Sequence, residues 1–164
     1  MNERNARYNT KNFLLILMAA FIFCCQESYA LSYSKKGNRY SYSITKKDSI
    51  YLLVVSITGE KVVLPPNPEL KLKTLGDDVI TLNGELIGQD AQNGGMIMYG
   101  MIIPLHQITV SAQFVVDKAV MEKIGSGISK VRLSTAPQHE CEFKKDKIGK
   151  KLYEMFLNLS KDDF

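Results

Sequence analysis

Apolar and polar residues alternate with a period of two along much of the chain after residue 30, which is the pattern of half-buried β-strands. The alternation is clearest from Gln107 to Val116, where every even-numbered position from Ile108 onward is apolar. The proline-rich stretch 65–68 ends a predicted strand, because proline removes a donor from the hydrogen-bonded ladder. Alternation or enrichment in β-branched residues predicts the other strands, at 40–44, 50–57, 61–64, 69–75, 79–82, 85–87, 128–135 and 139–143.

Turn residues divide the middle of the chain. The pair Asn83-Gly84 predicts a tight hairpin between 79–82 and 85–87, because both residues tolerate a positive φ. The polar, glycine-rich segment Gly88–Gly95 is interpreted as a loop. The apolar run Met96–Ile103 is interpreted as a buried strand with a bulge at its glycine.

Two helices complete the predicted fold. Asp117 is an N-cap for a short helix near 117–125, which Gly125 ends. A longer amphipathic helix near 146–160, capped by Asp146, carries one apolar stripe, formed by Ile148, Leu152, Met155, Phe156 and Leu159. The predicted class is α+β: a mostly antiparallel sheet of about seven to nine short strands with a short helix and a C-terminal helix.

The amino terminus has the three parts of a secretory signal. Residues 1–12 carry a basic excess, Phe13–Cys25 is continuously apolar, and Ser28-Tyr29-Ala30 has the small residues of a cleavage site. An apolar helix of 13 residues rises about 20 Å, which is too short to span a membrane core of about 30 Å. We therefore predict a signal peptide at 1–30 and one globular domain at 31–164, exported to the periplasm or the exterior.

The cysteines leave one alternative open. Cys25 lies at the depth of a lipoprotein acylation site, although the residues before it are bulky, so a membrane-tethered chain is the second interpretation. After cleavage at residue 30 only Cys141 remains, which excludes an internal disulfide.

Composition narrows the function classes. The chain has 164 residues, 45% of them apolar, which excludes wholesale disorder. Its small basic excess, 21 Lys and Arg against 17 Asp and Glu, is only a weak argument for nucleic-acid binding. No Lys or Arg lies between Thr74 and Asp117, and basic residues gather at both ends of the mature chain. The late group, Lys144, Lys145, Lys147, Lys150 and Lys151, is interpreted first as a solvated helix face and, as the alternative, as a possible interaction site for an anionic surface.

Catalytic and metal chemistry has little support in the residues. His106, His139 and Cys141 lack the clustered spacing of a zinc site. Gly125-Ser126-Gly127 lacks the spacing of a nucleophile elbow, and Asp77-Asp78 is typical of a solvated turn. No phosphate- or dinucleotide-binding motif is present, so we expect no cofactor and no enzyme.

Two further segments suggest interactions. Asp48-Ser49-Ile50 resembles the acceptor pattern of bacterial O-glycosylation, with Ser49 as the acceptor. The methionine-rich segment Met96–Met101 is interpreted either as core or as an adaptable apolar contact surface.

Residues 127–133 and 143–149 resemble segments of small exported bacterial α+β proteins of unassigned function, and the resemblance covers residues 100–160. It implies export and the α+β architecture, and no activity. The predicted function is a non-enzymatic periplasmic or secreted binding module, whose partner is another envelope protein or an anionic surface. The alternatives are a small barrel-like carrier of an apolar ligand and, third, a hydrolytic enzyme without a recognisable motif.

Overall fold

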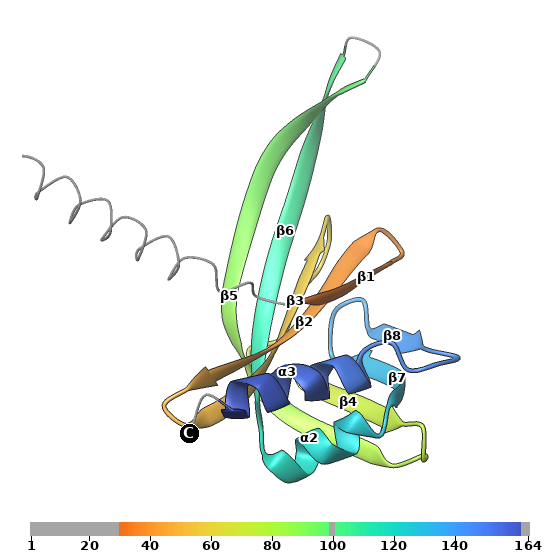
Figure 1. Ribbon diagram of the computed structural model, residues 1–164. Coiled ribbons are helices and arrows are strands. Elements are labelled where there is room, and N and C mark those ends of the chain that lie inside the picture. Colours follow the sequence, from red (N-terminus) through yellow and green to blue (C-terminus); the bar gives the residue numbers. More distant parts are fainter. Residues whose placement is uncertain (1–29, 99–100, 162–164) are drawn as a thin grey trace, which may run out of the picture.

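The computed structural model describes residues 30–98 and 101–161. In these residues eight strands form one antiparallel sheet that curls into a half-barrel, in the order β1-β2-β3-β6-β5-β4-β7-β8 (Figure 1). The strands are β1 (Leu31–Lys35), β2 (Asn38–Lys47), β3 (Ile50–Gly59), β4 (Glu69–Thr74), β5 (Val79–Met98), β6 (Met101–Val116), β7 (Ile128–Leu133) and β8 (His139–Glu142). The helices are α2 (Lys118–Gly125) and α3 (Gly149–Lys161). The predicted α+β class is confirmed.

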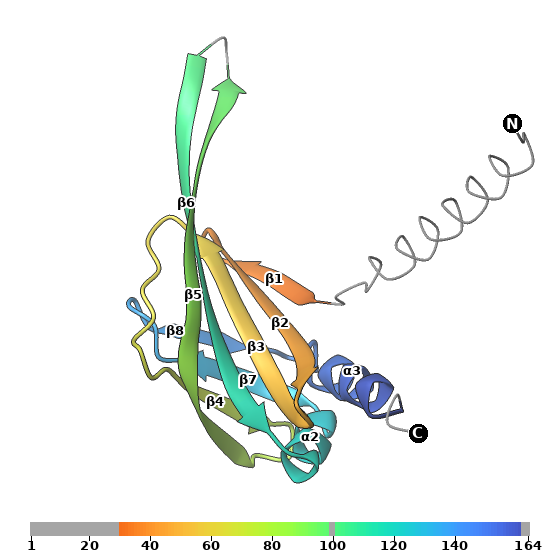
Figure 2. The ribbon, with the colours of Figure 1, turned by 90° about the vertical axis from the view of Figure 1, so that its left-hand side faces the viewer.

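One hydrophobic core joins the sheet to both helices. The strands contribute the apolar half of each alternation, and Leu53, Val55 and Phe114 are completely buried. The helix α3 contributes Leu152 and Phe156, and it packs against both α2 and β2 (Figure 2). The stripe predicted for this helix therefore covers the core.

Both predicted helix caps are confirmed. The carboxylate of Asp117 accepts a hydrogen bond from the backbone amide of Val120 at 2.7 Å. Asp146 lies three residues before α3, and its oxygens accept from the amides of Gly149 and Lys150 at 2.7 and 2.8 Å. The helix itself begins at Gly149 rather than at the predicted residue 146.

The predicted hairpin at Asn83-Gly84 is wrong. These residues lie inside β5, which runs without a turn from Val79 to Met98. A Cβ on Gly84 would lie 2.6 Å from ring atoms of Phe114, so the glycine permits close packing of two strands. The two-residue turns occur instead at Lys36-Gly37 and Asp48-Ser49, where all four φ angles are positive.

Three other boundaries differ from the prediction. The segment before residue 40, which gave no clear strand signal, forms β1. Residues 61–64 form only an isolated bridge, between Val63 and Ala136. The predicted loop Gly88–Gly95 is part of β5, and the run 96–103 is divided between the end of β5 and the start of β6.

Candidate functional site

The most unusual element of the molecule is the long β5–β6 hairpin, which projects well beyond the rest of the sheet (Figures 1 and 2). The neighbouring strand β3 pairs with β6 only as far as Ile108. On the other side, β4 pairs with β5 only as far as Asn83. Beyond these points β5 and β6 pair only with each other in the described part of the chain. We call Gly88–Met98 together with Met101–Gln107 the ribbon.

The loop between β3 and β4 shows where the ribbon becomes free. Carbonyl oxygens of Pro68 and Pro66 accept hydrogen bonds from the amides of Gly84 and Leu86, at 2.9 and 3.0 Å. These two bonds extend the coverage of the outer edge of β5 beyond the end of β4. From Gly88 onward no described strand pairs with that edge. A row of backbone donors and acceptors therefore remains available to a partner.

The residue types on the ribbon suit a contact surface. No charged residue occurs from Ala91 to Val116. The register places Met96 opposite Ile103 and Met98 opposite Met101, at the far end of the ribbon. At its base the side chains of Leu86 and Ile87 are 36% and 47% exposed, which leaves an apolar surface on β5 without cover. The two interpretations of the methionine-rich segment depend on side chains that lie outside the described part of the chain.

A second cluster lies where the two edge strands of the half-barrel approach each other, and we call it the edge seam: Tyr33, Tyr40, Tyr42 and His139. The hydroxyl of Tyr33 on β1 is 2.9 Å from the hydroxyl of Tyr42 and 2.8 Å from Nε2 of His139 on β8. The ring of Tyr40 stacks on His139, with 3.6 Å between centroids. Beside it, Nζ of Lys35 donates to the carbonyl oxygen of Glu140 at 2.5 Å.

Burial controls the protonation of the edge seam. It raises the pKa of Tyr33 and of Tyr42 above the ordinary value for tyrosine, and the neighbouring phenol of Tyr42 adds to the shift at Tyr33. Burial and, second, the charge of Lys35 lower the pKa of His139 to about 4. Tyr33, Tyr42 and His139 are therefore uncharged at neutral pH, and the hydroxyl of Tyr33 forms a hydrogen bond with each of the other two side chains. This arrangement joins β1 to β8 without a backbone ladder.

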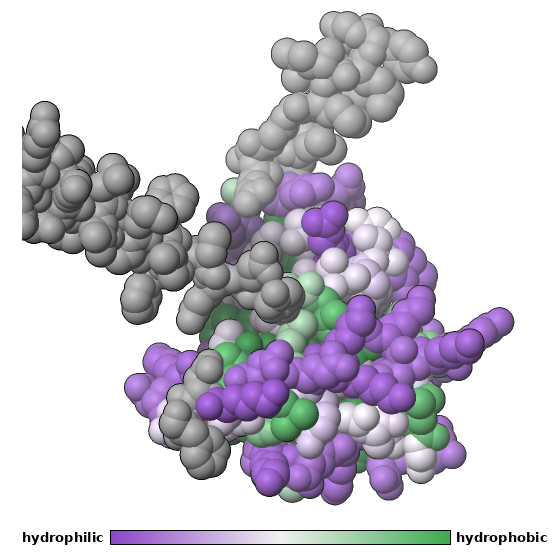
Figure 3. Space-filling view, viewed as in Figure 1, coloured by the Kyte–Doolittle hydropathy of each residue, from purple (hydrophilic) through white to green (hydrophobic). Residues whose placement is uncertain are grey.

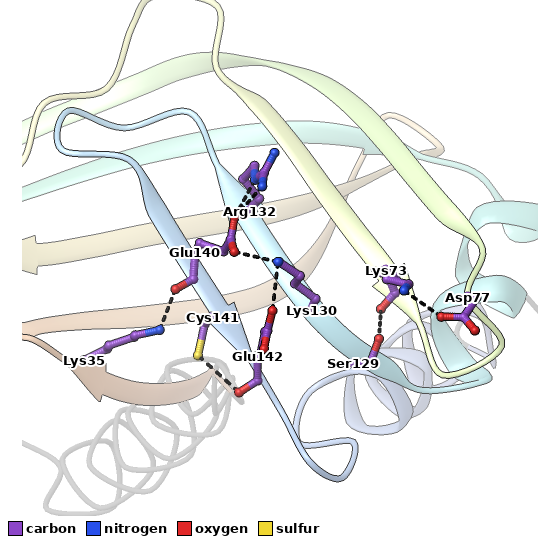
Figure 4. Close-up of polar contacts among 9 residues, drawn as sticks. All are labelled: Lys35, Lys73, Asp77, Ser129, Lys130, Arg132, Glu140, Cys141 and Glu142. Atoms are coloured by element: carbon purple, nitrogen blue, oxygen red, sulfur yellow. Dashed lines mark hydrogen bonds and ion pairs between the residues drawn. The ribbon is translucent and has the colours of Figure 1, made fainter.

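A third cluster is the set of basic residues on the outer face of β4 and β7. Lys71 lies directly opposite Arg132, and Lys73 opposite Lys130, around a shallow hollow that these side chains line with Val79. Like charges in such positions repel each other, and acids at the rim compensate for them. The ion pairs are Lys71–Glu69, Lys73–Asp77, Lys130–Glu140, Lys130–Glu142 and Arg132–Glu140, with N–O distances of 2.6–2.8 Å. Figure 4 shows the last four of these pairs.

Because an acid neutralises each of these cations, the cluster is an ion-pair network across the sheet. The sequence alternation places its members on one face, but it does not indicate that β4 and β7, about 60 residues apart, are neighbours. The network lowers the pKa values of Glu140 and Glu142, through hydrogen bonds from Lys130.

The late lysines of the predicted interaction site are all exposed. Lys144, Lys145 and Lys147 lie between β8 and α3, and Lys150 and Lys151 lie in the first turn of α3. Hydrophilic side chains gather over this helix (Figure 3). The early basic residues are divided between the two ends of β2, with Lys36 before it and Lys47 at its last position. Of these early basic residues, Lys35 contacts β8, through its hydrogen bond to the carbonyl oxygen of Glu140.

The remaining candidates occupy ordinary positions. Ser49 is exposed in the β2–β3 turn, and Asp77 and Asp78 are exposed in the turn after β4. Ser126 is the C-cap of α2, and its hydroxyl donates to the carbonyl of Lys123 at 2.7 Å, so this segment ends a helix as predicted.

Among the described residues no three His, Cys, Asp or Glu side chains form a group that could hold a metal ion. The side chain of His106 lies outside this description, and Cys141 is a buried free thiol. No helix in the described ranges has the length and apolar character needed to cross a membrane. The predicted signal at 1–30 and the acylation site at Cys25 lie before or at the edge of these ranges.

Comparisons with known proteins returned nothing to set beside this geometry. No family model, curated protein or solved structure matches the chain.

Proposed function

We propose that this protein is an exported, non-enzymatic binding module, and that the ribbon is the element that contacts its partner. One observation carries the proposal: the ribbon extends beyond both neighbouring strands, carries no charged residue from Ala91 onward, and has outer edges that no described strand pairs. Long, uncharged strand edges associate with other chains, and proteins usually shorten, charge or cover them. An edge that lacks all three protections is suited to binding.

The exposed backbone favours a polypeptide as the partner. A hydrocarbon phase offers no hydrogen bond to an open strand edge, and each unsatisfied backbone group there costs several kcal/mol. A strand of another protein supplies these bonds by extending the sheet. The absence of charged residues from Ala91 to Gln107 also favours an apolar protein surface over an anionic polymer.

The packing supports a binding module over a carrier of an apolar ligand. A carrier needs an interior cavity, and Phe114 is one of the residues expected to line it. This side chain is completely buried, and its ring packs closely against Gly84. The apolar surface that remains uncovered lies on β5 instead, at Leu86 and Ile87.

The proposal is tested by shortening the ribbon. Gln92 and Gln107 are register partners, so Asn-Gly in place of residues 93–106 closes a two-residue hairpin at that pair. Mature protein, the shortened variant and a variant with Gln at the five late lysines are each cross-linked in the native envelope fraction. We expect the full-length ribbon and the lysine variant to capture the same protein, and the shortened variant to lose it.

Unfolding by urea controls for the fold of each variant. Capture by a folded, shortened variant would contradict the proposal. Loss of capture with the lysine variant and with rising salt, while the shortened variant still binds, would assign binding to the late lysines instead.

Export and modification are tested by the intact mass of the secreted protein. We expect a chain that begins at Leu31, which is also the first residue of β1. A chain that begins at an acylated Cys25 would establish the lipoprotein alternative. Ser49 is exposed, and an added sugar mass that disappears in the Ser49→Ala variant would establish the predicted glycosylation.

A further inference from the structure

We propose that the partner of the ribbon is a second copy of this chain. In this arrangement the β5 edges of two ribbons pair in antiparallel fashion about a two-fold axis at Gln92, over Gly88–Met96, and form a four-stranded sheet. This inference rests on the proposed function, because it names the partner of the same element. Two features carry it, namely which edge is open and how residue types are distributed along that edge.

The two outer edges of the ribbon are not equivalent. On β6, Pro104 lies within the strand, opposite Gly95, and proline has no amide to donate. Proline is tolerated in a sheet where its nitrogen faces away from the neighbouring strand, so it interrupts the outer edge of β6. On β5, Gly88–Met98 contains no proline. A Cβ added to Gly88 would meet no atom within 4 Å, so nothing packs on that face of β5 where the ribbon begins.

Two identical antiparallel strands must pair symmetrically about one residue, so that positions equally far before and after it face each other. With the axis at Gln92, Gly88 of one copy lies opposite Met96 of the other. The exposed Leu86 and Ile87 lie just before this pairing, at a β-bulge, and Ile97 and Met98 of the other copy follow it at the same end. The polar residues lie in the middle of the pairing. Apolar residues at both ends of one strand are therefore matched by apolar residues of its symmetric copy.

Charge is compatible with the same register. Asp90 is the single charged residue in Gly88–Met98, and the register places it opposite Gly94 of the other copy rather than opposite its own equivalent. No pair of like charges is therefore brought together. Because the contact is symmetric it closes on itself, and Pro104 hinders addition of a further copy at the β6 edge. The expected product is a dimer, not a fibre.

A cysteine at the axis tests the register. Residues directly opposite in an antiparallel pair have Cβ atoms about 4.5–5.5 Å apart, close to disulfide geometry. In mature protein with Cys141→Ala, we expect Gln92→Cys to form a disulfide-linked dimer under mild oxidation. Gln107→Cys is the matched control, since it is the partner of Gln92 on the other strand, and it should stay largely monomeric.

Sedimentation of the unmodified mature chain gives an independent measurement. A dimer that becomes a monomer on shortening the ribbon supports the inference. Equal cross-linking at positions 92 and 107, or a monomeric mature chain with no cross-link at 92, would overturn it. If ribbon-dependent capture of a different protein persists in that case, the proposed function stands and only the identity of the partner fails. If that capture is also absent, both fail.

Discussion

Gly84 shows how strongly one missing side chain affects the packing of this sheet. A Cβ at this position would lie 2.5 Å from the carbonyl oxygen of Gln113 and 2.6 Å from the ring of Phe114. We therefore expect Gly84→Ala to lower the free energy of unfolding by about 1–3 kcal/mol, through overpacking of a completely buried ring. Gly88→Ala is the control on the same strand, because its Cβ would meet nothing within 4 Å. Urea unfolding of both variants measures the difference, and equal losses would contradict the explanation.

His139 makes stability depend on pH. Burial and the charge of Lys35 lower its pKa to about 4 in the folded chain, against about 6.5 when unfolded. Between these values the unfolded state binds the proton and the folded state does not. Stability is therefore complete above pH 6.5 and declines as the pH falls toward 4. We expect a loss of about 2 kcal/mol over this range, after allowance for partial solvent screening.

The measurement is urea unfolding at several pH values, in the mature protein and in His139→Gln. Carboxylates also titrate near the lower end of the range, and the difference between the two proteins removes their contribution. A slope that is the same in both would show that another group controls the pH dependence.

The start of α3 is held by the side chain of a residue that precedes the helix. Asp146 accepts hydrogen bonds from four backbone amides, those of Ile148, Gly149 and Lys150 before and in α3 and that of Ile128 in β7. Partial burial works to raise the pKa of this carboxyl, and the four hydrogen bonds lower it below the ordinary value. The side chain thus connects the start of the helix to the sheet.

We expect Asp146→Ala to lower the free energy of unfolding by about 1–2 kcal/mol, at the upper end of the range for helix caps. Asp117→Ala is the control, since Asp117 is exposed and its carboxylate caps α2 through Val120 alone. Asp117→Ala should lower the free energy of unfolding by less than Asp146→Ala does. Thermal or urea unfolding compares the two, and a larger loss at Asp117 would contradict the role given to Asp146.

The elements also show what local sequence can predict. Alternation located β4, β6, β7 and β8, and capping residues located both helices, because these signals act between residues close in the chain. The course of β5 was missed because its cause is distant in sequence. Asn83-Gly84 is a strong turn signal by itself, yet Gly84 must pack against Phe114, thirty residues later. The polar segment Gly88–Gly95 is ordered by pairing with β6.

The candidate site was predictable only in part for the same reason. The methionine-rich segment was recognised as a possible contact surface from its composition. Its position beyond the neighbouring strands is set by the points where β3 and β4 stop pairing with the hairpin. No local sequence pattern predicts those points. The edge seam likewise joins Tyr33 to His139 across 106 positions of sequence.

At the scale of the whole molecule, the half-barrel leaves two edge strands, and the edge seam holds them together by side chains. The hydroxyl of Tyr33 is the common partner of Tyr42 and His139, and Tyr42 is only 1% exposed. Tyr33→Phe keeps the ring packing and removes this hydroxyl, which leaves buried polar groups with fewer partners. Such a change costs about 1–3 kcal/mol.

The loss should be local to the seam, because β3 and β6 lie in the middle of the sheet and keep both neighbours. We expect hydrogen exchange at the amides of 139–142 to accelerate in Tyr33→Phe, while exchange in β3 and in the base of β6 is unchanged. Ser34→Ala on the same strand is the control, since that residue is exposed. If exchange in β8 is the same in both variants, the Tyr33 hydroxyl is not what joins the edges. The hydrogen bond from Nζ of Lys35 to the carbonyl oxygen of Glu140 would then be the next contact to remove.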